Sequence, residues 1–292
     1  MVLRLRSMMR IARIRARALR SQLKVLLRGA SNRGRRMRQC VIAIRCEIGV
    51  WRGSLPIAPF ATHSRIYVRK GGDSSWRVAF SRLPDWPEMN IWSSYLKPGV
   101  VFCDVGANVG LYTLMAAELE CSVVSVEPAV DMLHSLRANI ELNGLTKVRI
   151  EPVACMNQVG FVGLSGPDAN QRVATIGNGG TPATTIDLLL DGEIPAGIKI
   201  DVEGNERLVL EGAKATLSSH GLDLIQLEWN DTSLHALSET RAPVAEILHS
   251  YGFALFQVKE SGGFAEFTAH ECPPFGRDVF AARNEAVRLF AN

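Results

Sequence analysis

From residue 100 onward, apolar runs of strand length alternate with segments of helical periodicity, and this alternation constrains the fold more than any other feature. Such alternation is typical of a parallel sheet covered by helices on both faces. The expected strands are residues 100–105, 122–126, 147–154, 198–202 and 222–228, and the expected helices are residues 109–119, 130–142, 206–218 and 242–251. Two further runs, residues 254–258 and 278–282, are expected to close the sheet as a hairpin. The sequence therefore predicts an α/β fold with a doubly wound, mostly parallel sheet.

The stretch between residues 157 and 184 interrupts this alternation. It is rich in glycine, asparagine and threonine, and glycine and asparagine in particular favour turns over regular elements. We expect this stretch to be irregular, with at most a short edge strand.

The first 46 residues differ in charge from the rest of the chain. They hold thirteen arginines, one lysine and no acidic residue, whereas the whole chain has a net charge of only +4. Residues 1–28 have the pattern of an amphipathic helix, with apolar side chains within an arc of about 100° and basic side chains opposite. Such a helix suits the surface of an anionic membrane. We therefore interpret residues 1–50 as a basic amphipathic arm, in which residues 29–34 end the helix.

The sequence leaves other roles for this arm open. It could grip RNA, imitate a transit peptide or be an extension from a wrongly chosen start codon, and an arm without any catalytic role is the simplest interpretation. We expect no nucleic acid partner, because positions 1–50 contain no aromatic side chain on which bases could stack.

Residues 51–99 are expected to form a small cap subdomain that leads into the main domain, residues 100–285. The runs at residues 65–69 and 76–80 flank a Gly-Gly-Asp turn and predict a hairpin. Trp76, Trp86 and Trp92 follow one another before residues 95–99. We expect their rings mainly to pack against the sheet, although they could also shape a substrate pocket.

The six cysteines show no spacing typical of a metal site. Cys103 and Cys121 lie in strand-like apolar runs, which predicts buried, reduced thiols and a reducing compartment. No apolar stretch approaches the ~20 residues of a membrane span, and the N-terminus lacks the pattern of a secretory signal. These features predict a soluble, cytoplasmic body.

A glycine loop follows the first expected strand: Asp104-Val-Gly-Ala-Asn-Val-Gly110, directly before a helix. In doubly wound folds, ligands bind outside the carboxyl ends of the strands. Gly106 and Gly110 allow a sharp turn and close approach of a ligand, and the helix start offers unpaired N–H groups. Asn108 stands where a dinucleotide-binding loop has its second glycine. The loop therefore favours a group smaller than a pyrophosphate, such as the zwitterionic end of S-adenosylmethionine, whose ammonium Asp104 could bind.

Acidic residues follow two further strands. Glu127 comes about twenty positions after the loop, where a carboxylate can accept hydrogen bonds from both ribose hydroxyls, although it could also simply cap the next helix. After the fourth strand, Lys199, Asp201 and Glu203 alternate along the chain and so share one orientation. Glu206 is expected mainly to start the following helix, whose dipole favours a carboxylate there.

Several segments closely resemble the FkbM family of methyltransferases, in the same order and spacing: residues 104–113, 126–128, 136–143, 185–187 and 199–213, with Glu228 after the fifth strand. The resemblance covers about residues 96–260. It implies a seven-stranded, Rossmann-like class I fold that binds S-adenosylmethionine and methylates a hydroxyl of a sugar, glycan or secondary metabolite. The residues expected to contact the cofactor are Asp104, Gly106, Ala107, Asn108, Gly110, Glu127, Pro128, Ala154 and Asp201.

Transfer to a hydroxyl requires alignment of the acceptor with the methyl carbon and benefits from a general base. Asp201 and Glu203 are the first candidates for this base, and Glu228 is the third. If Asp201 instead holds the ammonium of the cofactor, Glu203 remains as the base. The three carboxylates could together hold a divalent cation, although we expect no metal.

Two other functions use the same fold. An NAD-dependent oxidoreductase would need the dinucleotide-binding loop that this chain lacks. A non-catalytic binding module, associated with a membrane through its basic arm, would tolerate a damaged cofactor site, whereas here every expected cofactor residue is present.

Overall fold

The computed structural model describes residues 22, 24–27, 32, 34–71, 74–166, 172–177, 180–229, 239–259, 263–266 and 278–290. The chain forms two compact units, Met1–Trp86 and Pro87–Asn292. The division into an arm, a cap and a main domain at residues 50 and 99 stays a prediction.

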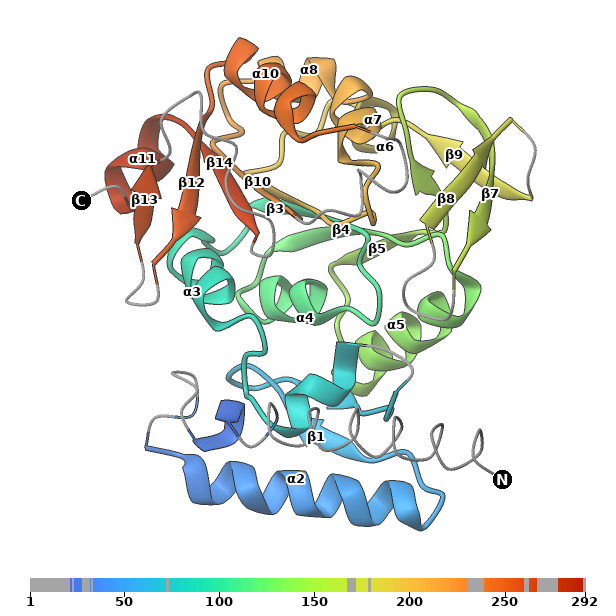
Figure 1. Cartoon of the computed structure of the whole chain (residues 1–292), viewed down its shortest axis with the longest axis vertical. Coiled ribbons are helices and arrows are strands. Elements are labelled where there is room, and N and C mark those ends of the chain that lie inside the picture. The colour runs from blue at the N-terminus through green and yellow to red at the C-terminus, as the bar shows by residue number, and fades with distance from the viewer. Residues whose placement is uncertain are drawn as a thin grey trace, which may run out of the picture. The chain divides into compact units, whose positions relative to one another are not determined.

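The larger unit is built around an eight-stranded sheet in the order β13-β12-β14-β11-β10-β3-β4-β5 (Figure 1). Its strands are β3 (Val101–Val105), β4 (Ser122–Val126), β5 (Val148–Glu151), β10 (Gly197–Ile200), β11 (Leu224–Leu227), β12 (Ala254–Val258), β13 (Phe264–Glu266) and β14 (Val279–Ala282). Five neighbouring strands, β5, β4, β3, β10 and β11, pair in parallel. The pairs β11–β14, β14–β12 and β12–β13 are antiparallel. The predicted doubly wound, mostly parallel sheet is confirmed, with eight strands instead of seven because β13 adds an edge strand.

Helices cover both faces of this sheet. They are α3 (Trp86–Tyr95), α4 (Leu111–Glu118), α5 (Val130–Leu142), α6 (Ile186–Leu190), α7 (Glu206–Glu211), α8 (Lys214–Ser218), α10 (Ala242–Ser250) and α11 (Asn284–Phe290). Figure 1 shows α3, α4 and α5 on one side of the sheet and α6, α7, α8 and α10 on the other. Every residue of β10, β11 and β14 is buried, as expected for strands of a sheet covered on both faces.

The helix expected at residues 206–218 is two short helices, α7 and α8, which are separated by Gly212 and Ala213. A Cβ on Gly212 would lie 2.1 Å from the carbonyl oxygen of Met156. The carboxylate of Asp187 accepts the backbone N–H groups of Ala215 and Thr216, 2.9 Å away in each case, at the start of α8. The break therefore lets the chain pass close to a neighbouring segment while Asp187 caps the new helix start.

The prediction that residues 157–184 are irregular is wrong, and the third strand, predicted over residues 147–154, is shorter than predicted. That strand ends at Glu151, and a second sheet has the order β6-β9-β7-β8. Its strands are β6 (Ala154–Cys155), β7 (Gly160–Ser165), β8 (Arg172–Ile176) and β9 (Thr181–Thr184). Pro152 has no N–H to donate and thus ends the pairing of β5. The chain then turns into the second sheet, whose strands expose many residues and so lack a strong apolar pattern.

The smaller unit contains α2 (Arg36–Trp51), β1 (Ile57–Pro59), β2 (Arg65–Tyr67) and the 3₁₀ helix η2 (Ser74–Ala79). The predicted hairpin between residues 65–69 and 76–80 is wrong. Instead, β2 pairs antiparallel with β1, and Ser75, Trp76, Val78 and Ala79 of η2 are all buried. Strand geometry would alternate buried and exposed side chains, whereas a tight helix can bury these residues together.

Helix α2 was not predicted. The buried amide of Gln39 holds it against η2 by donating to the carbonyl oxygens of Val78 at 2.9 Å and Ala79 at 3.0 Å. Of the amphipathic helix expected over residues 1–28, only Gln22 and residues 24–27 are described, and they are helical. The rest of that prediction lies outside the described residues.

The cysteines that the structure describes are free thiols, and Cys103 and Cys121 are buried as expected. Burial raises the pKa of the Cys121 thiol to about 11, which keeps it protonated and unreactive. Cys272 lies outside the described residues. Among the described residues, no helix combines the length and the hydrophobicity that a bilayer span requires.

The close approach at Gly212 predicts a large effect of a single methyl group. Gly212→Ala should lower the free energy of unfolding by ~1–3 kcal/mol, because backbone must move to admit the Cβ. Gly160→Ala is the matched control, since no atom lies within 4 Å of the Cβ it would add. Urea unfolding of both variants measures the difference, and equal midpoints for the two would contradict this account of the helix break.

Candidate functional site

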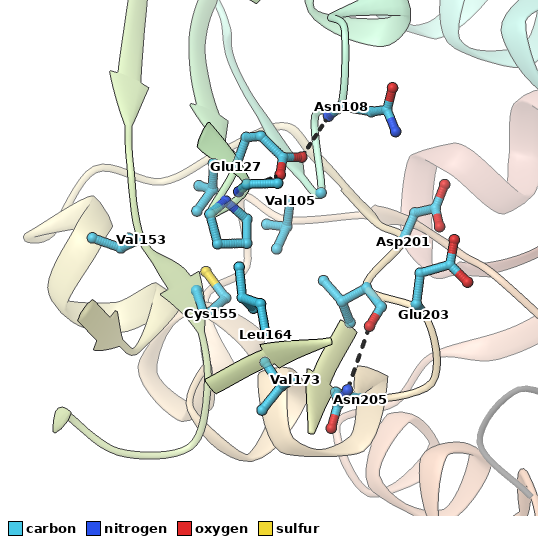
Figure 2. A pocket seen from close by; sticks show the side chains of 16 residues that line it. Val105, Asn108, Glu127, Val153, Cys155, Leu164, Val173, Asp201, Glu203 and Asn205 are labelled. Carbon is cyan, nitrogen blue, oxygen red and sulfur yellow. Dashed lines mark hydrogen bonds between the residues drawn. The ribbon is translucent and has the colours of Figure 1, made fainter. Parts of the chain in front are cut away.

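A pocket lies at the carboxyl ends of β3, β4 and β10, where the sequence placed the ligand (Figure 2). Its empty volume, including the opening to solvent, is about 680 Å³. The predicted site residues that line it are Gly106, Asn108, Glu127, Pro128, Ala154, Asp201 and Glu203. The other four predicted residues, Asp104, Ala107, Gly110 and Glu228, are not among its lining residues.

The glycine loop is held by the strand ends on both sides of it. The N–H groups of Gly106 and Ala107 both donate to the carbonyl oxygen of Val126, at 2.9 and 3.0 Å. Gly106 has a φ of +79°, and a Cβ there would lie 1.8 Å from the carbonyl oxygen of Asp201. Glycine is therefore required at position 106 by the neighbouring backbone, independently of any ligand.

The second half of the loop is also internally bonded. Asn108 has a φ of +53°, and its side-chain oxygen accepts the N–H of Val109 at 2.8 Å. Gly110 donates to Ala107 at 2.9 Å, and with a φ of +93° it forms the N-cap of α4. Each N–H group of residues 106–110 already has a partner, so this part of the loop offers none of them to a ligand. Recognition falls to the side chains and to the shape of the loop.

Glu127 connects the loop to the next helix. One carboxylate oxygen accepts the N–H of Asn108 and the other accepts the N–H of Ala129, both at 2.8 Å. Burial raises the pKa of Glu127, although these two hydrogen bonds oppose the shift. Each oxygen of a carboxylate has a second lone pair, so Glu127 can cap the helix and still accept a hydrogen bond from a ligand in the pocket.

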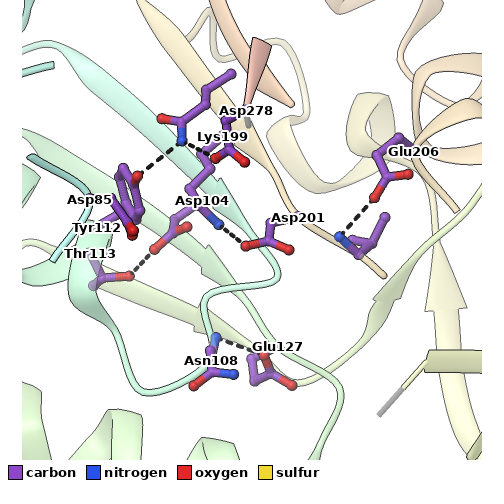
Figure 3. A network of polar contacts seen from close by, with 12 residues as sticks. Asp85, Asp104, Asn108, Tyr112, Thr113, Glu127, Lys199, Asp201, Glu206 and Asp278 are labelled. Atoms are coloured by element: carbon purple, nitrogen blue, oxygen red, sulfur yellow. Dashed lines mark hydrogen bonds and ion pairs between the residues drawn. The ribbon is translucent and has the colours of Figure 1, made fainter. Parts of the chain in front are cut away.

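Asp104 lies behind the pocket, on β3. It is fully buried, and one of its oxygens accepts the hydroxyl of Thr113 at 2.7 Å (Figure 3). The other oxygen has no hydrogen-bond partner among the described residues. Burial raises the pKa of Asp104, and the charge of Lys199 and the hydrogen bond from Thr113 act against this. Asp104 therefore connects the end of β3 to α4 through Thr113 and does not line the pocket.

Lys199 is the neighbour of Asp104 in the register between β10 and β3. Its ammonium is buried, lies 2.9 Å from a carboxylate oxygen of Asp201 and sits 4.9 Å from the centre of the Tyr112 ring. Burial lowers the pKa of Lys199, but the carboxylates of Asp201 and Asp104 outweigh burial and raise it overall. Lys199 therefore stays charged and partly neutralises the acidic residues around it.

The predicted base candidates come together at one end of the site. Asp201, Glu203 and Glu228 each place one carboxylate oxygen within 4.8 Å of the others. Oxygen ligands at this spacing also suit a hard divalent cation. Burial and then the carboxylates of Asp201 and Glu203 raise the pKa of Glu228 to about 10, so Glu228 holds a proton in neutral solution and is a poor base.

Glu206 and Arg241 form a buried ion pair, and both side chains are fully buried. The other oxygen of Glu206 accepts the N–H groups of Val202 and Gly204, at 3.2 Å each. Glu206 thereby fixes the backbone on both sides of Glu203, which has a φ of +54°. Arg241 was not predicted, because nothing in the sequence before α10 marks it as buried.

Polar residues behind Lys199 were also missed. The fully buried amide of Gln226 donates to the hydroxyl of Tyr112 at 3.0 Å and to Asp278 at 2.6 Å, and it accepts the indole N–H of Trp92. Figure 3 shows Tyr112 and Asp278 of this network beside Lys199. A single glutamine inside the apolar run of the fifth strand is the signal that could have revealed it.

The comparison with protein families identifies the domain that carries this pocket. Residues 104–255, more than half of the chain, match the model of the Methyltransferase FkbM domain. The chain belongs to the FkbM methyltransferase family. The matched part of this FkbM domain begins in β3 and ends in β12, and it includes every residue that lines the pocket. No curated protein matches the chain.

Solved structures that resemble this FkbM protein are distant. A precorrin-6y C5,15-methyltransferase from Geobacter metallireducens has 15% identity and a TM-score of 0.40, with 75% of this chain and 95% of that chain covered. An rRNA methylase from Streptococcus thermophilus has 12% identity and a TM-score of 0.40, covering 67% and 93%. The magnesium protoporphyrin IX methyltransferase of Synechocystis with bound SAM has 15% identity and a TM-score of 0.38, covering 68% and 78%.

The raised pKa of Glu228 predicts a specific pH dependence of stability. The unfolded chain releases this proton near pH 4.5 but the folded chain only near pH 10, so the folded state binds more protons between these values. Stability should therefore fall as pH rises through this window. Glu228→Gln should remove that dependence, and its thermal midpoint should exceed that of the native protein increasingly from about pH 6 to about pH 9.

The measurement is a thermal unfolding series in a chelating buffer, because a bound divalent cation would keep Glu228 ionised. Glu141→Gln, an exposed position on α5, is the control. If the curves of Glu228→Gln and the native protein stay parallel over this range, the pKa of Glu228 is not raised.

Proposed function

We propose that this chain is an S-adenosylmethionine-dependent methyltransferase that methylates a hydroxyl of a sugar, glycan or secondary metabolite. The observation that carries this proposal is the pocket of the FkbM domain, in which Glu127, Asp201 and Glu203 surround one cavity at the carboxyl ends of three parallel strands.

The polarity of the pocket fits the parts of this cofactor. Glu127 retains lone pairs for the ribose hydroxyls, and beside it Val153, Cys155 and Leu164 offer an apolar wall to an adenine ring (Figure 2). Asp201 lies on the other side of the pocket, where its carboxylate would bind the ammonium of the methionine part. The three carboxylates in the lining would repel a pyrophosphate, which speaks against a nicotinamide dinucleotide.

S-adenosylmethionine supplies an electrophilic methyl group on a positively charged sulfur. With this cofactor bound, Glu203 would take the proton of the acceptor hydroxyl, so that the oxygen could accept the methyl group. Glu203 is preferred over Glu228 because it lines the pocket and because Glu228 is already protonated. The carboxylates of Asp201 and Glu203 would favour a positively charged cofactor over its neutral product.

The proposed localisation is cytoplasmic, with peripheral association of residues 1–28 with an anionic membrane surface. The basic composition of these residues supports this part of the proposal.

The role of Glu127 can be tested by direct binding. Glu127→Ala should weaken S-adenosylmethionine binding at least tenfold, because two buried hydroxyl donors lose their acceptor at ~1–3 kcal/mol each. Glu127→Gln should keep part of the affinity, since one amide oxygen remains. Calorimetry measures both, and the exposed Glu141→Ala on α5 is the control. Unchanged affinity of Glu127→Ala for S-adenosylmethionine would show that Glu127 does not bind the cofactor. If NAD stabilises the native protein and S-adenosylmethionine does not, the proposed cofactor is wrong.

Two substitutions distinguish cofactor binding by Asp201 from proton acceptance by Glu203. Asp201→Asn should weaken cofactor binding, because the ammonium loses its counter-charge. Glu203→Gln should bind the cofactor normally but transfer methyl groups ~10²–10⁴-fold more slowly, the usual contribution of a positioned base. The assay is single-turnover transfer of a labelled methyl group from the cofactor to a metabolite and glycan extract. Full activity of Glu203→Gln would show that alignment alone suffices.

A further inference from the structure

Helix α2 has one buried face and one exposed apolar face. One is buried within the smaller unit through Gln39, Ala43 and Cys46. The opposite face, here called the outer face, consists of Met37 (84% exposed), Val41 (52%), Ile44 (59%), Ile48 (44%) and Trp51 (85%). At 100° per residue these five side chains fall within about 80° of the helix surface. Exposed apolar side chains aligned in this way mark a docking surface more often than single ones do.

The surroundings of the outer face are positively charged. Exposed arginines flank it at Arg36, Arg38, Arg45 and Arg52. The single acidic residue of α2, Glu47, is paired with Lys70. A partner for this face must therefore combine apolar groups with negative charge.

A groove runs beside the outer face, between α2 and the segment that carries β1 and β2. Its empty volume, including its opening, is about 1020 Å³. Val41, Ile42 and Ile57 contribute apolar walls, and three arginines, Arg38, Arg45 and Arg65, also line it. No described carboxylate lines this groove. Guanidinium groups beside an apolar wall match a phosphate that is joined to an acyl chain.

We propose that the outer face of α2 and this groove dock onto the surface of an anionic phospholipid membrane. The apolar side chains enter the boundary between headgroups and acyl chains, with Trp51 at the interface, where tryptophan is enriched. Arg38, Arg45 and Arg65 bind lipid phosphates. This surface is distinct from residues 1–28, whose membrane association is proposed above.

Charge disfavours the other partners that could cover the outer face. A second copy of α2 would bring two rows of arginine together without acidic partners. Residues 1–28 of the same chain hold nine basic and no acidic residues, so they would be repelled as well. A nucleic acid would satisfy the arginines but would leave Met37, Val41, Ile44 and Ile48 exposed to water.

The test uses the full chain and vesicles made of equimolar phosphatidylcholine and phosphatidylglycerol, with pure phosphatidylcholine for comparison. The native protein should co-sediment with the anionic vesicles and be released by salt. The double variant Ile44→Asp/Ile48→Asp should bind at least tenfold more weakly. Leu188→Asp is the matched control, because Leu188 is a helical residue with 60% exposure, against 59% for Ile44, and it should bind normally.

Two further measurements identify the contacts. Arg38→Gln and Arg45→Gln should each weaken binding about fivefold, the value of one basic residue near an anionic surface. Vesicles with brominated acyl chains should quench tryptophan emission in the native protein, and Trp51→Phe should lose that quenching. Circular dichroism must show the same melting midpoint for Ile44→Asp/Ile48→Asp and the native protein.

Normal binding of a folded Ile44→Asp/Ile48→Asp variant would overturn the proposal and leave membrane binding to residues 1–28. Equal binding to neutral and anionic vesicles would overturn the role of the arginines. If light scattering shows a dimer that Ile44→Asp/Ile48→Asp abolishes, and vesicles do not compete with it, the outer face joins two copies of the chain.

Discussion

The candidate site depends on one buried cation. Lys199 lies in β10 opposite Asp104 and 2.9 Å from the carboxylate of Asp201, in a region where parallel strands bring several acidic side chains to one edge of the sheet. Without its charge, Asp104 and Asp201 would repel each other in surroundings that screen poorly. A buried lysine is costly to desolvate, and here the hydrogen-bonded carboxylate of Asp201 and the ring of Tyr112 offset that cost. The strand edge can thus remain acidic enough to attract a cationic cofactor.

The backbone adds a second constraint at the same place. Gly106 passes so close to the carbonyl of Asp201 that no side chain fits between them, and Glu127 joins the loop to the start of α5. The loop, the end of β10 and the end of β4 are therefore one rigid corner. Residues that hold this corner, such as Gly106 and Ala107, support the site through the backbone and need not touch a ligand.

Much of the fold could be predicted, because its strong patterns are local. β4 and α5 have the predicted limits, since both have clear apolar periods and unambiguous ends. The second sheet could not be predicted, because its short strands show no regular apolar alternation and the exposed positions of β7 and β9 include glycine, phenylalanine and proline. Of the acidic residues expected in the site, Glu127, Asp201 and Glu203 line the pocket, whereas Asp104 and Glu228 are not among its lining residues. Arg241 was missed because its partner, Glu206, is 35 residues away, and only the folded chain brings them together.

The buried pair of Glu206 and Arg241 has a consequence for how this scaffold can change. Arg241 also lies 5.6 Å from the centre of the ring of Trp229, the second residue after β11. One guanidinium group thus joins the end of β11 to the start of α7 and to the start of α10. Because Glu206 holds the backbone on both sides of Glu203, a substitution of Arg241 would reach the site through two elements at once.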